Sequence, residues 1–116
     1  MFGAGYVSAE DRMFMMDTLR HIGRGRLSEF LGASEANLAS DEAIYRTSGY
    51  TEEELQAMID RVKGLHPELG PLAHADLMAY VDGVNQYISE ARTDPTKLPA
   101  EYEALHSSGS CVWWRR

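Results

Sequence analysis

Residues 51–62 carry the clearest periodic pattern in the sequence. Thr51 and Glu54 have the spacing of a capping box, in which the threonine hydroxyl accepts a hydrogen bond from the first helical turn and the glutamate reaches back. Apolar residues then follow at the i, i+3, i+4 and i+7 positions of a helix, namely Leu55, Met58, Ile59 and Val62. We therefore expect a helix with one apolar face, which ends near residues 64–66 because Pro67 cannot continue it.

An earlier helix is expected to begin at Ser8, because Ser8 and Asp11 have the form of a second capping box. Its predicted apolar face contains Met15, Leu19 and Ile22, with Met16 beside them. Gly23 and Gly25 predict a break, since a glycine inside a helix costs about 1 kcal/mol relative to alanine. One or two further turns over residues 27–31 would then end at Gly32, which has the helix C′ role.

The remaining segments are also predicted to be helical or connecting. Residues 33–41 are small and polar, and we expect Ser40 or Asp41 to cap a short helix through Tyr45. A long helix over residues 72–91 carries an apolar stripe of Leu77, Tyr80, Val81, Val84 and Ile88, with Tyr87 flanking it. A last short turn runs through Leu105. Because no segment has a convincing strand pattern, the sequence predicts an all-α chain of about four helices.

The charge distribution restricts the classes of function. The 116 residues include 18 acidic and 11 basic side chains, which give a net charge of −7, and the acids are spread along the chain. A phosphate-binding surface needs a basic patch, and the densest basic stretch, residues 20–26, is more simply a solvated or ion-paired helix end. We therefore expect no nucleic-acid partner. Nor do we expect a membrane span or a signal peptide in this chain.

Residues that could carry chemistry are few. Four histidines lie far apart and form no HxxxH or HExxH pair: His21, His66, His74 and His106. The single cysteine, Cys111, excludes an internal disulfide and a multi-cysteine metal site. No GxSxG nucleophile motif and no GxxxxGK[ST] phosphate loop is present. We therefore assign no catalytic residue, no metal site and no cofactor to this chain, and the substrate-binding residues stay unidentified.

The first helix contains two groups that favour a structural interpretation. Its methionines and Phe14 could line a ligand pocket, but their helical spacing favours a core role. Asp17 and Arg20, with the neighbouring Asp11 and Arg12, are expected to form exposed ion pairs, each worth about 0.3 to 0.5 kcal/mol. Without further information, the residues indicate an acidic helical domain of unknown role.

Three blocks of sequence occur in a fixed order. The first block covers residues 5–17 as GYVSAEDRMFMMD and continues through Leu19-Arg20 to residues 25–32, GRLSEFLG. The second covers residues 79–88 as AYVDGVNQYI, and the third covers residues 98–102 as LPAEY. In order and spacing these blocks resemble the α chain of the penicillin acylase (penicillin amidase) family, over residues from about 3 to 105.

The resemblance implies an N-terminal nucleophile hydrolase. In such enzymes a precursor cuts itself into α and β chains, and the new N-terminal serine of the β chain attacks an amide carbonyl with its own amino group as the base. The implied substrates are acylated amines such as β-lactam antibiotics, acyl-homoserine lactones or lipopeptides. The implied location is periplasmic or secreted, and the implied partner is the β chain of the same precursor, whose αββα core the helices would surround.

Residues 1–105 are accordingly expected to be a helical part of an α chain, and residues 106–116 an off-pattern tail. Ser107, Ser108 and Ser110 do not stand at a chain start, so the fragment is expected to be inactive alone. Helix faces that pack on the core in the family would be exposed in an isolated chain, which predicts self-association. The alternative is a standalone helical protein-binding module.

Overall fold

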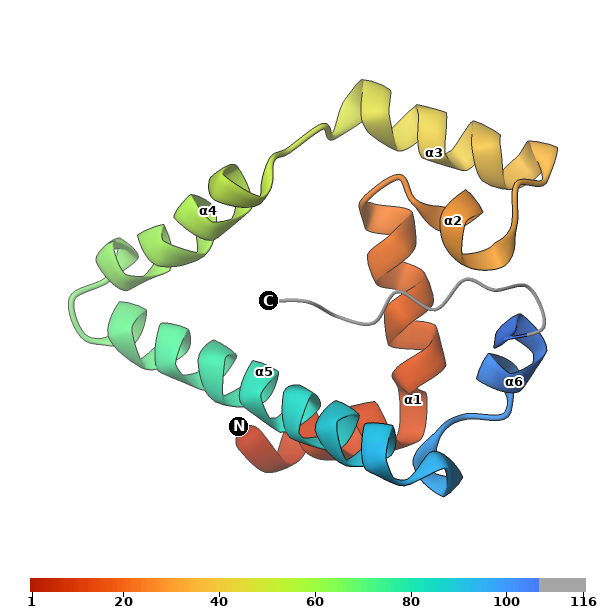
Figure 1. Ribbon diagram of the computed structural model, residues 1–116. Coiled ribbons are helices and arrows are strands. Elements are labelled where there is room, and N and C mark those ends of the chain that lie inside the picture. The colour runs from red at the N-terminus through yellow and green to blue at the C-terminus, as the bar shows by residue number, and fades with distance from the viewer. Residues whose placement is uncertain (107–116) are drawn as a thin grey trace. The chain divides into compact units, whose positions relative to one another are not determined.

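The computed structural model describes residues 1–106, which form helices joined by short connections (Figure 1). In chain order they are α1 (Phe2–Gly23), α2 (Leu27–Leu31), α3 (Glu35–Thr47), α4 (Glu52–Leu65), α5 (Leu69–Thr93), the 3-10 helix η1 (Pro95–Lys97) and α6 (Glu101–His106). No strand occurs among these residues, so the predicted all-α class is confirmed. The described part contains six α-helices rather than about four, because the short turns expected over residues 27–31 and through Leu105 are the separate helices α2 and α6. Residues 107–116, most of the predicted tail, lie outside the described residues.

The described residues divide into two compact units. The first unit contains residues 1–12 and 50–97, and the second contains residues 13–49 and 98–106. The division falls inside α1, at the point where the backbone of Arg12 (φ −139°, ψ 22°) interrupts the helical geometry. The two halves of α1 therefore belong to different units.

In the first unit, the first half of α1 packs closely on α5. A methyl group added to Gly5 would overlap the backbone carbonyl of Tyr80, and one added to Gly83 would overlap the carbonyl of Phe2. The backbones of the two helices can approach this closely only because glycine has no side chain. The α5 side chains buried in this unit are Val84, Tyr87, Ile88 and Ala91.

The expected start of the first helix is wrong, because the residues before Ser8 are helical and pack closely on α5. The sequence predicts a start at Ser8, but α1 begins at Phe2, so Ser8 lies inside the helix and does not cap it. The contact between Gly5 and Tyr80 joins residues far apart in the chain, and no local capping pattern reports such a contact. Tertiary packing therefore outweighs the local signal here.

The predicted capping box of α4 is confirmed. The Thr51 hydroxyl accepts a hydrogen bond from the backbone N–H of Glu54 at 3.2 Å, and the Glu54 carboxylate accepts one from the Thr51 N–H at 2.8 Å. The helix ends at Leu65, before Pro67, as expected. The next helix, α5, extends the predicted range of residues 72–91 at both ends.

The second unit has an aromatic core. Its buried apolar side chains are Met13, Leu27, Phe30 and Tyr102. The rings of Phe14, Phe30 and Tyr102 lie with their centroids 5.4 to 6.3 Å apart, in tilted and edge-to-face arrangements. Such pairs add about 0.5–1.5 kcal/mol beyond the apolar area they bury. The rings therefore join α1, α2 and α6.

The predicted apolar face of α1 is wrong in its register. Met15 and Leu19 are exposed, whereas Met13 and Asp17 are buried. The rings of α2 and α6 cover the face that contains Met13, Phe14 and Asp17, and these partners are not visible in the local pattern. The break after the helix is confirmed, since α1 ends at Gly23 and Gly25 adopts a positive φ of 62°. Gly32 ends α2 with a φ of 94°, as predicted for a residue that stops a helix.

The expected start of the third helix is also wrong. Ser34, and not Ser40 or Asp41, caps α3, because its side chain accepts a hydrogen bond from the backbone N–H of Asn37. Ser48 ends the helix. Asp41 lies in the middle of α3, where it is buried.

Among residues 1–106, no helix is both long enough and apolar enough to cross a membrane.

Candidate functional site

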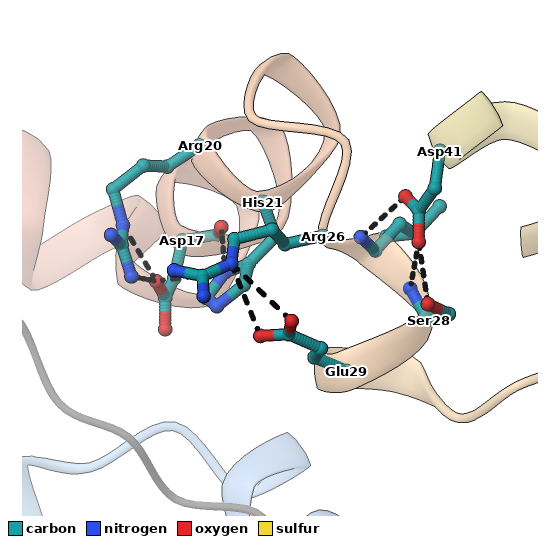
Figure 2. A network of polar contacts seen from close by, with 8 residues as sticks. Asp17, Arg20, His21, Arg26, Ser28, Glu29 and Asp41 are labelled. Carbon is teal, nitrogen blue, oxygen red and sulfur yellow. Dashed lines mark hydrogen bonds and ion pairs between the residues drawn. The ribbon is translucent and has the colours of Figure 1, made fainter. Parts of the chain in front are cut away.

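The first polar cluster centres on Asp17 in the second unit (Figure 2). One carboxylate oxygen of Asp17 accepts hydrogen bonds from the Arg20 guanidinium at 3.2 and 3.3 Å, and the other accepts one from the Tyr102 hydroxyl at 3.1 Å. His21 Nδ1 lies 2.8 Å from the backbone carbonyl of Asp17, and the ring of His21 stacks on Phe30. The cluster therefore ties α1 to both α2 and α6.

Burial distinguishes Asp17 from the predicted surface ion pairs. The sequence places Asp17 and Arg20 in an exposed pair, and the pair does form, with its closest N···O distance at 3.2 Å. However, Asp17 is only 8 % exposed and Tyr102 is 2 % exposed. A buried carboxylate has to be compensated by hydrogen bonds or opposite charge, and here both are present.

The second polar cluster centres on Asp41 of α3 (Figure 2). Its carboxylate accepts hydrogen bonds from the backbone N–H groups of Leu27 and Ser28 at 2.7 and 2.9 Å, and from the Ser28 hydroxyl. Burial raises the pKa of Asp41, but the hydrogen bonds from Ser28 and Leu27 outweigh burial and hold that pKa below its ordinary value. Asp41 thus caps the first turn of α2 from a different helix.

The third polar cluster lies in the first unit. Glu90 of α5 accepts hydrogen bonds from the Lys97 ammonium, from Gln86 at 2.9 Å and from the Tyr6 hydroxyl at 2.7 Å. The hydrogen bond from Lys97, followed by those from Gln86 and Tyr6, lowers the pKa of Glu90 to about 2. The same contact with Glu90 raises the pKa of Lys97. Tyr87 donates a hydrogen bond to the backbone carbonyl of Lys97 at 2.8 Å, so the cluster joins α1, α5 and η1.

These three clusters serve packing. Their charged and hydroxyl groups bond to one another, and within residues 1–106 every buried side-chain nitrogen or oxygen has a hydrogen-bond partner. Local sequence patterns predicted the pair of Asp17 and Arg20 but missed the contacts with distant partners, which lie 13 to 85 residues apart along the chain. One signal was available, since Tyr6, Asp17 and Tyr102 stand inside the sequence blocks.

The histidines are dispersed, as their spacing suggests. His66 lies just after α4 and accepts hydrogen bonds from the backbone N–H groups of residues 68 and 69, and His74 lies 3.7 Å from Asp60. Among residues 1–105 no group of three or more His, Cys, Asp or Glu side chains is arranged to hold a metal ion. Cys111 and the serines at 107, 108 and 110 lie outside the described residues.

The first sequence block contacts the second block in the first unit and the third block in the second unit. In the first unit, the first and second blocks meet at Gly5 and Tyr80 and at Tyr6 and Tyr87. In the second unit, the first and third blocks meet through the ring of Tyr102, which contacts Phe14 and donates a hydrogen bond to Asp17. The blocks therefore contain residues through which α1 packs on α5 and on α6.

Comparison with known proteins agrees with this pattern of blocks. The profile of the penicillin amidase family matches residues 1–114. Penicillin G acylase of Escherichia coli is 32 % identical over 105 residues, which cover 90 % of this chain and 11 % of that protein. No solved structure gives a significant match. The chain spans only about a tenth of the length of this relative, yet the profile covers nearly all of the chain. The chain therefore belongs to the penicillin amidase family.

Proposed function

We propose that this chain is a helical part of the α chain of an amide hydrolase that cleaves acylated amines. The observation that carries the proposal is the family match over residues 1–114, together with the 32 % identity to the E. coli penicillin G acylase. The proposed substrates are β-lactam antibiotics, acyl-homoserine lactones or similar acylated amines. The proposed location of the whole enzyme is periplasmic or secreted.

The reaction itself is assigned to an N-terminal serine on a β chain of the same precursor, and this chain is proposed to be inactive alone. The hydrogen bonding of the polar clusters supports this division of labour. Asp17, Asp41 and Glu90 are each held by donors from their own unit, so their role is to fix helices in place. No cofactor or metal is assigned to this chain.

The proposed partner is the β chain, and the exposed apolar side chains support a role in assembly. Met15 and Leu19 of α1 and Met58 of α4 are half exposed, and Leu65 and Leu72 are more so. A contiguous patch of exposed apolar side chains usually marks a protein–protein contact, and the side chains of each unit are candidates for such a patch. In the absence of the partner, the same side chains are proposed to cause self-association.

An acyl anilide that releases a chromogenic amine tests the function. The purified chain should give no turnover, whereas the product expressed from the gene together with its flanking coding sequence should hydrolyse the anilide and show cleavage into two chains. Robust turnover by the chain alone would contradict the assignment of the chemistry to a second chain. If the gene product bound a protein partner but showed neither processing nor turnover, the binding-module alternative would replace the proposal.

A matched pair of chimeras tests whether this chain does the structural job of an α-chain segment. The chain replaces the matched segment of the E. coli enzyme, and one version carries Gly3→Ala while the other carries Gly5→Ala. The Gly3 site has open space around it, whereas a methyl group at Gly5 would overlap the Tyr80 carbonyl. We expect hydrolysis by the Gly3→Ala chimera and at least a tenfold loss in the Gly5→Ala chimera. Equal activities would show that the observed packing of α1 on α5 is not what the enzyme uses.

A further inference from the structure

The helix with the clearest apolar pattern is also the least buried long helix. Four apolar side chains recur along α4 at helical spacing and define what we call the α4 stripe: Leu55, Met58, Val62 and Leu65. None of the residues of α4 is buried, and the exposed fractions of Met58 and Leu65 are 49 % and 78 %. An amphipathic helix in a folded protein normally turns such a stripe toward other protein atoms.

The contacts that α4 does make leave Leu55, Met58 and Leu65 of the stripe exposed, while Val62 is half-buried. The turn between α4 and α5 brings the backbone carbonyls of Val62 and Lys63 against Gly70. The carboxylate of Asp60, which is not part of the stripe, lies 3.7 Å from the imidazole of His74 on α5. Neither of these two contacts uses a side chain of the stripe.

The charge of the α4–α5 hairpin restricts what can cover the stripe. Residues 51–93 contain eight acidic and three basic side chains, so the hairpin carries −5 of the net charge of −7. A second copy of the chain would bring a hairpin of the same sign to the contact. Protein interfaces favour opposite charges, because juxtaposed like charges cost free energy and slow association. The hairpin is therefore matched to a basic partner.

We propose that the α4 stripe is a docking surface for an apolar segment with flanking lysine or arginine side chains, supplied by the same precursor polypeptide. This inference rests on the proposed function, and it adds which helix binds and what chemistry it binds. The E. coli relative is far longer than the part that this chain matches, so a precursor of that size has ample chain to supply the segment. The apolar side of the segment packs on the stripe, and its basic groups lie opposite the carboxylates of the hairpin.

Two synthetic amphipathic peptides provide the probe. Both have leucine at the same helical positions, and the remaining positions are lysine in one peptide and glutamate in the other. Fluorescence anisotropy of each labelled peptide, titrated with the chain at physiological salt, gives the two dissociation constants. We expect saturable binding of the leucine–lysine peptide that is at least about tenfold tighter than binding of the leucine–glutamate peptide. Equal affinities, or no binding of either peptide, would overturn the proposal.

A pair of surface variants tests whether the peptide binds to the stripe. Met58→Lys adds a charge in the middle of the stripe, and Leu38→Lys adds the same charge on α3, where Leu38 is 51 % exposed against 49 % for Met58. Because both side chains are exposed to the same degree, neither change should affect folding, which circular dichroism checks. Met58→Lys should weaken binding of the leucine–lysine peptide about tenfold, and Leu38→Lys should weaken it much less. Equal effects of the two variants would show that the stripe is not the binding surface.

Sedimentation of the same variants tests the remaining alternative, in which a second copy of the chain occupies the stripe. If the chain forms a dimer at neutral pH and low salt that Met58→Lys dissolves and Leu38→Lys does not, and a saturating amount of the leucine–lysine peptide leaves this dimer intact, the stripe is occupied by a second copy, and the precursor segment is ruled out. None of these measurements depends on hydrolysis. A negative result therefore leaves the anilide assay, and with it the proposed function, undisturbed.

Discussion

Asp17 and Asp41 are buried carboxylates in the second unit, and a helix other than their own supplies key donors to each. Tyr102 of α6 bonds to Asp17, and the first turn of α2 bonds to Asp41. Removing one partner of a buried charge is costly, because the remaining group loses its compensation without regaining water. The two carboxylates should therefore be the sites where a single atom or small group matters most.

Tyr102→Phe removes only the hydroxyl that donates to Asp17. We expect the free energy of unfolding to fall by about 1.5–3 kcal/mol, the range for a hydrogen bond to a charged acceptor. Tyr50→Phe is the matched control, since Tyr50 is 58 % exposed. Urea unfolding followed by circular dichroism measures both variants. Equal stabilities of the two would mean that the bond between Tyr102 and Asp17 contributes nothing.

Asp41→Ala removes the acceptor at the start of α2. The N–H groups of Leu27 and Ser28 then lose their partner, and we expect the melting temperature to fall by about 5 °C or more. Glu42→Ala, at the next position, breaks only the exposed ion pair with Arg46 and should shift the melting temperature by no more than a degree or two. A similar shift in both variants would contradict the capping role of Asp41.

At the scale of elements, the crossing of α1 and α5 depends on two glycines. Gly5→Ala places a methyl group against the Tyr80 carbonyl, and a backbone atom cannot rotate away as a side chain can. We expect a loss of about 1–3 kcal/mol, the usual cost of overpacking. Gly3→Ala, two residues earlier in the same helix, meets open space and should be neutral or stabilise by up to about 1 kcal/mol. Thermal unfolding of the two variants gives the comparison, and the reverse order of stability would refute the crossing.

The cluster of Tyr6, Glu90 and Lys97 makes the first unit sensitive to acid. The folded-state pKa of Glu90, about 2, lies below the ordinary value of 4.5, so the carboxylate stabilises the folded unit above about pH 5, and this contribution is lost as the pH falls toward 2. Glu90→Gln should lower the free energy of unfolding at pH 7. The difference in stability between this variant and the wild type should then shrink as the pH falls from about 5 toward 2. Glu53→Gln, at an exposed position of α4, should follow the wild type. Urea unfolding at several pH values tests the difference, and parallel curves for wild type and Glu90→Gln would contradict it.

The elements that the sequence predicts correctly depend on neighbours in the chain. The capping box of Thr51 and Glu54, the end of α4 before Pro67 and the break after Gly23 all involve residues within a few positions of one another. The predictions that are wrong depend on distant partners. Ser8 does not start α1 because α5 holds residues 2–7, and Asp41 does not cap α3 because it caps α2.

The long-range contacts of the polar clusters were beyond local prediction for the same reason. Glu90 and Tyr6 are 84 residues apart, and Asp17 and Tyr102 are 85 residues apart. Periodicity and capping patterns report on one helix at a time, so they do not pair such residues. The resemblance to a family did single out three of these four residues, because the blocks that define it include Tyr6, Asp17 and Tyr102, but it did not pair them.

At the scale of the whole molecule, apolar exposure and net charge oppose each other. Exposed apolar side chains on α1, α4 and α5 favour association, whereas the net charge of −7 at pH 7 makes identical chains repel. Salt at 0.1 M largely screens the repulsion between exposed charges that are more than about 10 Å apart. Acidification toward the isoelectric point near 5.0 removes the net charge itself.

We therefore expect the isolated chain to self-associate in a manner controlled by charge. At tens of micromolar and pH 7, sedimentation velocity should show a larger fraction of dimer or higher species at high salt than at low salt, because screening weakens repulsion while apolar contacts persist. Lowering the pH from 7 toward 5 at low salt should have the same effect, since both changes act on the same net charge. Hydrogen exchange measured alongside would verify that the chain stays folded at pH 5. Dissociation on adding salt would instead mean that ion pairs hold the copies together, and a stable monomer under all conditions would show that the exposed apolar side chains are too dispersed to bind another copy.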